Sequence, residues 1–188
     1  MMKAVAREFR RGFYGLFLLV IFIPFHSRVN GQEPVKIKRL TESIEFDGIP
    51  DEETWKSLDL FPLTMHRPNF GNQPSEASDV RVGYDDEFLW VGASLYMQDA
   101  SKIYAATKKR DEMLFDFDAF GIVLDSYNDN ENALAFYTAP TGLRTDYTIA
   151  NDAAGGMGPG GPGGMNISWD TFWDVKTTQD DKGWYVEM

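Results

Sequence analysis

The densest group of charged side chains lies in the run KRDEMLFDFDAF and its neighbouring Lys108, within residues 108–120. A planar guanidinium such as that of Arg110 can hold a carboxylate or a pair of hydroxyls through two hydrogen bonds. We therefore predict a rim of hydrogen-bonding groups around the aromatic ring of Phe115, formed by Arg110, Asp111 and Asp118. A solvated loop with exposed ion pairs explains the same charges equally well.

Two tryptophans, Trp169 and Trp173, flank Asp170 just after a glycine-rich run. Exposed aromatic faces with polar groups beside them are what a ring-shaped, hydroxyl-rich ligand requires, so the pair is a candidate binding platform. The alternative is that both rings cap a sheet edge, since aromatic residues mostly serve packing.

Residues 125–132 supply many of the oxygen ligands that Ca²⁺ prefers. Asp125, Asn128 and Asp129 form the candidate calcium site, although their spacing does not match an EF-hand loop. Turn-forming Asn and Asp residues explain this loop equally well. Asp47 and Asp51 are a second acidic candidate.

The residues needed for catalysis are scarce. The chain has no cysteine, and His66 is the only histidine outside the first 31 residues. There is no G-x-S-x-G motif, and carboxylates are so frequent that two of them close together carry little information. We therefore expect no enzyme activity within this segment.

The elements that must position these residues are strands. Apolar residues recur at period two over 44–46, 80–84, 120–124, 133–138, 144–149, 172–177 and 183–188, and the run 88–95 is continuously apolar, as in a central strand. Turn residues separate them at 85–87, 126–131, 140–142 and 180–183. Only residues 50–55 and part of 101–109 suggest short helices. This pattern predicts an all-β fold, an antiparallel β-sandwich.

Charge is distributed unevenly along the chain. The full chain of 188 residues has 18 basic and 29 acidic side chains. Residues 1–31 hold five of the basic ones, one acidic one and a short apolar run at 13–25, which is typical of a secretory signal peptide; an uncleaved anchor is the alternative. Removing them leaves 13 basic and 28 acidic side chains, a net charge of −15, which argues against a nucleic-acid partner.

Several segments in order resemble the family 9 carbohydrate-binding module. They are IEFDGIPDEETW (44–55), VRVGYDDEFLWVGASL (80–95), FDFDAFGIVLD (115–125) and GWYVEM (183–188). The motifs KRDEMLFDFDAF, TAPTGLRTD and WDTFWDV resemble the N-terminal module of large secreted Bacteroidetes-type proteins, which continue into a C-terminal domain of unknown function. The resemblance implies a two-sheet sandwich, often with bound calcium, that binds sugars.

The resemblance also implies site residues. Phe115 lies where the family has the first of two aromatic residues that clamp a sugar ring. Tyr137 lies near a family Arg, and Gly121 replaces a family Glu. The second clamp residue would fall after Met188.

We accordingly expect residues 1–31 to be a signal peptide and 32–188 a carbohydrate-binding β-sandwich, with a flexible glycine-rich loop at 153–165 that lacks the ending of a P-loop. We expect the chain to be the N-terminal piece of a longer exported protein of the periplasm, outer membrane or cell exterior, with no transmembrane helix in the mature chain. Its partner is a mono- or oligosaccharide, in support of polysaccharide breakdown. The alternatives are an envelope accessory domain that docks on its own C-terminal domain, and a piece of a glycoside hydrolase whose active site lies elsewhere.

Overall fold

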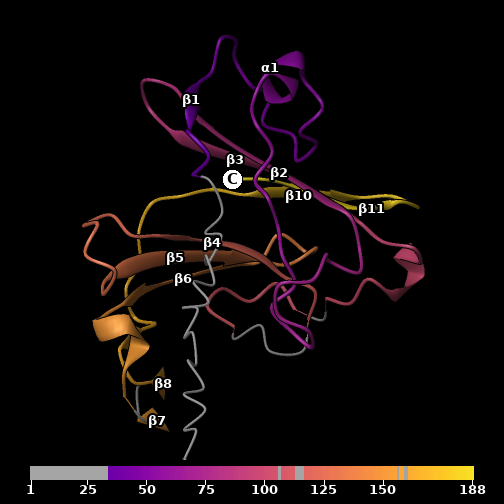
Figure 1. Ribbon diagram of the computed structural model, residues 1–188. Helices are drawn as coiled ribbons and strands as arrows, with labels where there is room; N and C mark the ends of the chain where they lie inside the picture. Colours follow the sequence, from indigo (N-terminus) through magenta and orange to yellow (C-terminus); the bar gives the residue numbers. More distant parts are fainter. Residues whose placement is uncertain (1–33, 106, 113–116, 156, 159–160) are drawn as a thin grey trace, which may run out of the picture. The chain divides into compact units, whose positions relative to one another are not determined.

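Strands of alternating apolar residues form two antiparallel-rich sheets in the computed structural model, which describes residues 34–105, 107–112, 117–155, 157–158 and 161–188 (Figure 1). The predicted all-β sandwich is confirmed. The predicted signal peptide and Phe115 lie outside the described residues.

The first sheet has the order β1-β2-β3-β11-β10. Its strands are β1 (Lys38–Arg39), β2 (Ser78–Tyr84), β3 (Leu89–Tyr96), β10 (Lys176–Gln179) and β11 (Gly183–Glu187). All neighbours are antiparallel except β1, which pairs with β2 in parallel. The C-terminal strand β11 lies between β3 and β10, so β3 is central and buried over much of its length, as its continuous apolar run predicts.

The second sheet has the order β4-β5-β6-β9. Its strands are β4 (Phe120–Leu124), β5 (Ala133–Thr138), β6 (Arg144–Ile149) and β9 (Met165–Asn166), and a separate two-stranded ladder joins β7 (Met157–Gly158) to β8 (Gly161–Pro162). The bounds of β4, β5 and β6 are those predicted from period two. The β5–β6 turn is tight because Gly142 adopts a φ of +73°, which glycine tolerates without strain.

The helices are short, as the sequence predicts. They are α1 (Glu53–Lys56) and the 3₁₀ turns η1 (Ala100–Lys102) and η2 (Asn151–Ala153). Helix α1 begins three residues after Pro50, so this proline precedes the helix instead of forming part of it. η1 takes up the start of the predicted helical stretch 101–109, and the described residues beyond it in that stretch are not helical.

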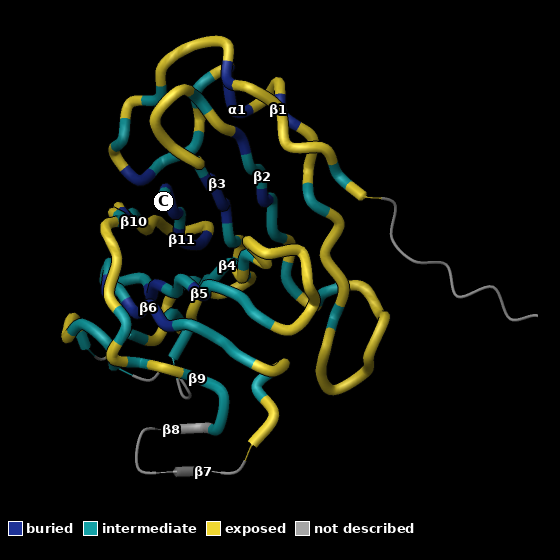
Figure 2. The backbone as a smooth tube through the Cα atoms, turned by 90° about the vertical axis from the view of Figure 1, so that its left-hand side faces the viewer, coloured by how far each residue is buried: buried dark blue, intermediate teal, exposed yellow. Residues whose placement is uncertain are grey.

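The core lies between the sheets. It is built on buried residues of the first sheet and the segment before β10 (Val80, Val91, Ala93, Val175, Trp184 and Val186), against which Phe120 and Ile122 of β4 pack. A second buried cluster joins Leu40, Trp55 and Leu58. Figure 2 shows buried backbone concentrated on β2, β3, β11 and β6. Trp55 and Trp184 are buried in these clusters, and Trp90 is half-buried.

A buried carboxylate ties the N-terminal segment to the last strand. Glu187 of β11 is fully buried and accepts hydrogen bonds from the backbone N–H groups of Asp47 and Gly48, at 2.9 and 2.8 Å, and from the indole Nε1–H of Trp55 at 3.1 Å. Burial raises the pKa of Glu187, and these donors oppose the rise.

One predicted strand is absent, and another begins later than predicted. Residues 43–47 form no strand, because the backbone N–H of Asp47 bonds to Glu187 and the apolar side chains pack on other side chains: Ile44 lies against the Trp55 cluster. Residues 172–175 are irregular, and the strand begins only at Lys176, because side chains of β6 bind the backbone around Thr171 and Trp173.

The glycine-rich run is described only in part. Met157–Gly158 pairs with Gly161–Pro162, and β9 follows directly and pairs with β6. The flexibility predicted for residues 153–165 stays a prediction.

Candidate functional site: an aromatic cleft between the sheets

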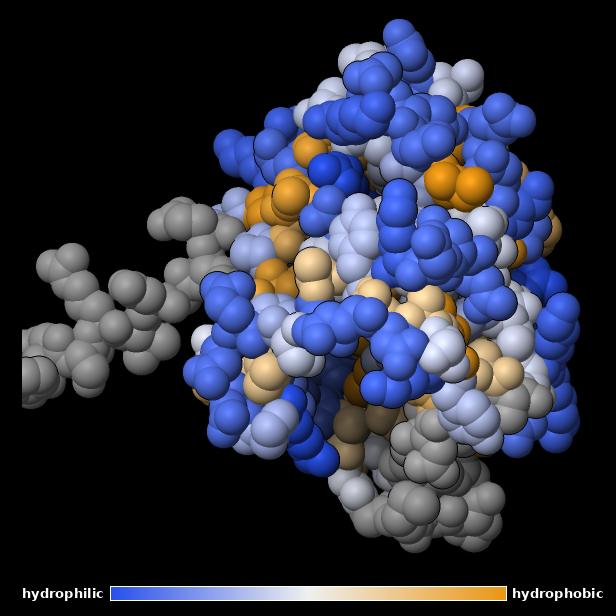
Figure 3. All heavy atoms as spheres, turned by 90° about the vertical axis from the view of Figure 1, so that its right-hand side faces the viewer, coloured by the Kyte–Doolittle hydropathy of each residue, from blue (hydrophilic) through white to orange (hydrophobic). Residues whose placement is uncertain are grey.

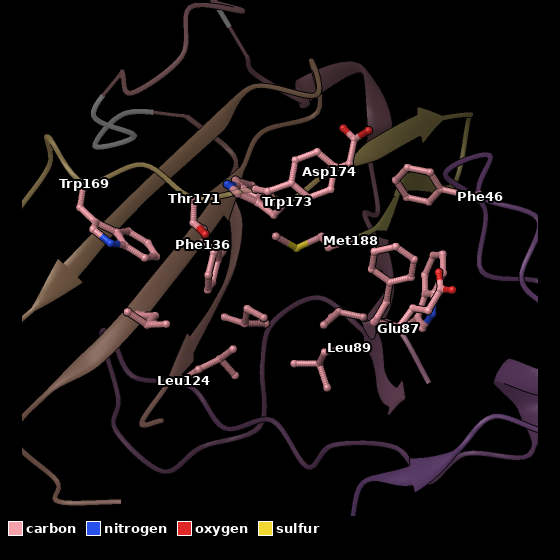
Figure 4. Close-up of a pocket in the computed structure, with 16 residues that line it drawn as sticks. Phe46, Glu87, Leu89, Leu124, Phe136, Trp169, Thr171, Trp173, Asp174 and Met188 are labelled. Carbon is pink, nitrogen blue, oxygen red and sulfur yellow. The ribbon is translucent and has the colours of Figure 1, made fainter. Parts of the chain in front are cut away.

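A cavity of about 550 Å³ lies between the two sheets, beside the end of β11. Its lining comes from β3, β4, β5, the segment 169–174 and the residues around Phe46 and Met188 (Figure 4). The residues are Phe46, Glu87, Phe88, Leu89, Trp90, Val91, Ile122, Leu124, Leu134, Phe136, Trp169, Thr171, Phe172, Trp173, Asp174 and Met188. We call this cavity the aromatic cleft.

Strand register explains why the β4 and β5 residues share one wall. Ile122 lies opposite Phe136, and Leu124 lies opposite Leu134. Directly opposed residues of an antiparallel pair point to the same face, so these four side chains all face the other sheet. Phe136 is also opposite Asp146 of β6, which places that carboxylate on the same face.

One end of the aromatic cleft is formed by three aromatic rings. Phe136 meets Trp169 at a ring-centroid distance of 6.2 Å and Trp173 at 5.5 Å, both edge to face. The Nε1–H of Trp173 is buried and has no hydrogen-bond partner among the described residues. Phe172, between the two tryptophans, is 91 % exposed. This arrangement, which we call the aromatic end, combines ring faces with an unused donor.

The segment that carries the tryptophans is held by side chains of β6. Asp146 is fully buried, and its Oδ2 accepts from the Thr171 backbone N–H at 2.9 Å. Arg144 Nη1 donates to the Trp173 carbonyl oxygen at 2.9 Å and lies 3.4 Å from Asp174 Oδ1. An irregular segment is therefore fixed without strand pairing.

A charged cluster supports Asp146 from the far side. Arg110 Nη2 lies 2.6 Å from Asp146 Oδ1 and 2.5 Å from Asp170 Oδ1, and Arg110 Nε lies 3.5 Å from Asp111 Oδ2. Burial lowers the pKa of Arg110, but the carboxylates of Asp170, Asp146 and Asp111 outweigh it and raise the pKa overall. Burial raises the pKa of Asp111 despite the opposing effect of Arg110. The guanidinium is thus held by the protein's own carboxylates.

The opposite side of the aromatic cleft is formed by Phe46, Phe88 and Trp90. Trp90 contacts Phe46 and Phe88 edge to face, with centroids 5.8 and 5.7 Å apart. Asp85 accepts from the Trp90 indole N–H at 2.7 Å, and the pKa of Asp85 is lowered by the backbone N–H groups of Glu87 and Phe88 together with that indole. The ammonium of Lys176 lies 5.3 Å from the centre of the Phe46 ring.

The structure brings some of the predicted site residues together and separates others. Trp169 and Trp173 line the aromatic cleft, while Arg110 and Asp111 lie in the cluster that supports it. Asp118 is occupied elsewhere, since its Oδ2 accepts from the Tyr104 backbone N–H at 2.7 Å. Phe115, the centre of the predicted rim, lies outside the described residues.

Tyr137 faces away from the aromatic cleft. It follows Phe136 along β5, so its side chain points to the opposite face of the sheet. There its ring stacks on Tyr147, with centroids 5.9 Å apart and planes at 5°, and covers Gly121. Burial raises the pKa of Tyr147. The structure therefore places Tyr137 in a packed pair outside the cleft.

The predicted calcium loop uses its carboxylates for its own turns. Asp125 accepts from the backbone N–H groups of Asp129 and Asn130, and Asp129 accepts from those of Glu131 and Asn132. Asn128 adopts a φ of +53°, as expected of a turn residue. Among the described residues, the acidic group that converges most closely is instead Asp111, Asp146 and Asp170, which surrounds Arg110. Calcium binding stays a prediction.

Sequence reasoning missed Phe136, Asp146 and Thr171. A signal existed for Asp146 alone, because an acidic residue at an inward position of an apolar strand needs a buried partner. Phe136 occupies an apolar strand position like that of any core residue, so the sequence does not mark it as a site residue. Thr171 acts through its backbone N–H, which every residue except proline has.

Comparisons with known proteins identify no relative of this chain. No family model, no curated protein and no solved structure matches the chain. In the part of the chain that is described, no helix has the length and apolar character to span a membrane.

Proposed function

We propose that this chain is a non-catalytic carbohydrate-binding module whose ligand occupies the aromatic end of the aromatic cleft. The observation that carries the proposal is the convergence of Phe136, Trp169 and Trp173 on an open cavity whose rim includes Thr171 and Asp174. Sugar rings present C–H faces that pack on aromatic rings and hydroxyls that bond to groups at the rim.

The size and polarity of the aromatic end support this ligand class. A cavity of about 550 Å³ falls in the range of roughly 300–1,000 Å³ that small-molecule sites occupy, which suits a mono- or disaccharide unit. The buried Trp173 Nε1–H lacks an acceptor among the described residues, and a sugar hydroxyl supplies one. The aromatic end that would hold the ligand is formed by Phe136 of β5 and by the segment 169–173.

Binding without catalysis fits the carboxylates near the aromatic end. Asp146 and Asp170 both face Arg110 within hydrogen-bond distance, and Asp146 also accepts from Thr171. Carboxylates engaged in this way position the binding segment and are not free to act as a general acid and base pair. We further propose that the module is exported and serves a polysaccharide-degrading protein whose chemistry lies in another domain.

Tryptophan fluorescence with a panel of mono- and oligosaccharides tests the proposal. We expect one sugar class to change the emission, and Trp169→Ala to weaken its binding by about tenfold, equal to about 1.4 kcal/mol. Phe172→Ala and Phe70→Ala form a matched pair, since both rings are exposed, at 91 % and 81 %, and only Phe172 lines the cleft.

The matched pair separates a local effect from a general one. Phe172→Ala should weaken sugar binding, Phe70→Ala should leave it unchanged, and neither should lower the melting temperature. Equal effects of the two variants, or no response to any sugar, would count against the proposal.

A further inference from the structure

The edge of the second sheet next to the aromatic cleft is open. β4 is the first strand in the order β4-β5-β6-β9 and pairs only with β5. Its other edge makes no backbone hydrogen bond to any of the described residues. An unpaired strand edge presents a row of N–H and C=O groups on which another extended chain can form a ladder.

This edge lacks the features that normally protect one. Natural edge strands carry a charged residue, a proline or a bulge, and the β4 sequence FGIVL contains no proline or charge and pairs with β5 without interruption. Val123 is 51 % exposed on the outer face. The edge is therefore competent for pairing.

An apolar slot accompanies the open edge. Ile122 and Leu124 line the aromatic cleft from β4, and Leu89 and Met188 line it from the side of the other sheet. Leu124, Leu89 and Met188 are labelled in Figure 4. Leu89 is 39 % exposed and the neighbouring Phe88 is 50 % exposed. A strand added to β4 would place every second side chain in this slot. The slot is the aliphatic part of the cleft and is distinct from the aromatic end.

Charge indicates the kind of chain that fits. Asp118 precedes β4, Asp125 follows it, and the exposed Glu87 borders the slot. Hydrophilic side chains dominate the face of the molecule in Figure 3, with apolar residues grouped between them. A second copy paired antiparallel through β4 would bring Asp118 of one copy toward Asp125 of the other, so like charges disfavour that arrangement. Basic flanking residues are instead attracted.

We propose that the β4 edge binds a partner polypeptide by strand addition, as an extended segment of alternating apolar residues flanked by Lys or Arg. Main-chain hydrogen bonds supply the pairing, and the apolar slot and acidic flanks select the sequence. The five residues of β4 span about 17 Å at about 3.4 Å per residue, so a segment of about five paired residues matches its length.

A set of synthetic peptides tests this inference by fluorescence anisotropy. The probe is Lys-Lys-Val-Thr-Ile-Thr-Val-Lys-Lys. Two further peptides carry backbone N-methyl groups in the central segment Val-Thr-Ile-Thr-Val: one on the Val and Ile residues, the other on the two Thr residues that alternate with them. Since only one edge of the added strand faces β4, methylation of one set should weaken binding at least about tenfold and methylation of the other set should leave it within about twofold. A peptide with Glu in place of the flanking Lys residues should bind more weakly.

A charge-reversal pair in the protein gives the second readout. Glu87→Lys should weaken binding of the basic probe by about threefold and reduce its salt dependence. Asp181→Lys should not, because Asp181 lies in the turn at the other end of β11 from Met188.

Several results would overturn the inference. Equal effects of the two N-methylated peptides would exclude strand addition, and a dimer of the free protein that is broken by the probe would assign the edge to a second copy. Absence of peptide binding in a protein that still binds sugar would remove this inference and leave the proposed function standing.

Discussion

Replacement of Glu187 by alanine should destabilise the domain by about 3 kcal/mol. The substitution removes the acceptor of three donors, the backbone N–H groups of Asp47 and Gly48 and the indole N–H of Trp55. A buried donor without a partner costs about 1–3 kcal/mol. Gly48 and Trp55 are buried, whereas Asp47 is exposed and its N–H can bond to water, so two donors carry most of the cost.

Two opposing effects keep the loss of folding free energy below the sum of the full penalties for the unpaired donors. Loss of a desolvated carboxylate is itself favourable, and water can enter the space it leaves. In a domain of this size, about 3 kcal/mol corresponds to a fall in melting temperature of roughly 6–12 °C. Glu187→Gln retains an oxygen for the two backbone donors and faces Trp55 with an amide, so it should cost about 1 kcal/mol.

Urea unfolding followed by circular dichroism measures both variants, with Glu42→Ala as an exposed control. The expected order of stability is wild type and Glu42→Ala, then Glu187→Gln, then Glu187→Ala. A free energy of unfolding for Glu187→Ala within about 0.5 kcal/mol of the wild type would show that Glu187 does not stabilise the fold in this way, as would equal losses for Glu187→Gln and Glu187→Ala.

Three further predictions concern pH, the cleft and a turn. Because burial raises the pKa of Glu187, the folded state holds the proton of this carboxyl more tightly than the unfolded state. The stability of the wild type relative to Glu187→Gln should therefore fall as pH rises from about 4.3 through the pKa of the folded state. A relative stability that increased over this pH range would contradict the prediction. Asp146→Asn should weaken sugar binding about tenfold and cost roughly 2 kcal/mol in urea unfolding, because Arg110 loses a buried partner but keeps Asp170; unchanged binding would remove Asp146 from the positioning role. Gly183→Ala should abolish stable folding in thermal melts, because its φ is +153° and a Cβ would lie 2.1 Å from the Leu95 carbonyl oxygen; a native melting temperature would show that the turn adjusts.

Much of the fold could be predicted because strand periodicity is local. The alternation in 133–138 and 144–149 gives the bounds of β5 and β6, and the turn residues between them give their pairing. Period-two alternation predicted a strand wrongly where side chains, instead of a neighbouring strand, accept the backbone hydrogen bonds. The alternation of Ile44 and Phe46 buries apolar groups without a strand, because Glu187 takes the backbone donors of the following residues.

The order of the first sheet could not be predicted locally. β11 lies between β3 and β10, and its pairing with β3 joins residues far apart in the sequence, such as Val186 and Ala93, which are 93 positions apart. No short-range pattern encodes that choice.

The candidate site was predictable only in part. Trp169 and Trp173 were identified by type and spacing, but the residues that hold them lie elsewhere in the chain. The ion pair of Arg110 with Asp146 spans 36 positions, so no local pattern could show that this guanidinium has an internal partner. The role of Arg110 in gripping a ligand stays a prediction. Phe136 resembles any core phenylalanine until the strand register places it beside the tryptophans.

The most direct test of the proposed function follows the tryptophan indole N–H signals in ¹H–¹⁵N spectra during titration with the sugar that changes the fluorescence. The signals of Trp169 and Trp173 should shift, and Trp173 should move further because its Nε1–H gains an acceptor. The signals of the buried Trp55 and Trp184 should stay in place. Shifts confined to tryptophans outside the aromatic end, or saturation of binding with neither Trp169 nor Trp173 affected, would contradict it.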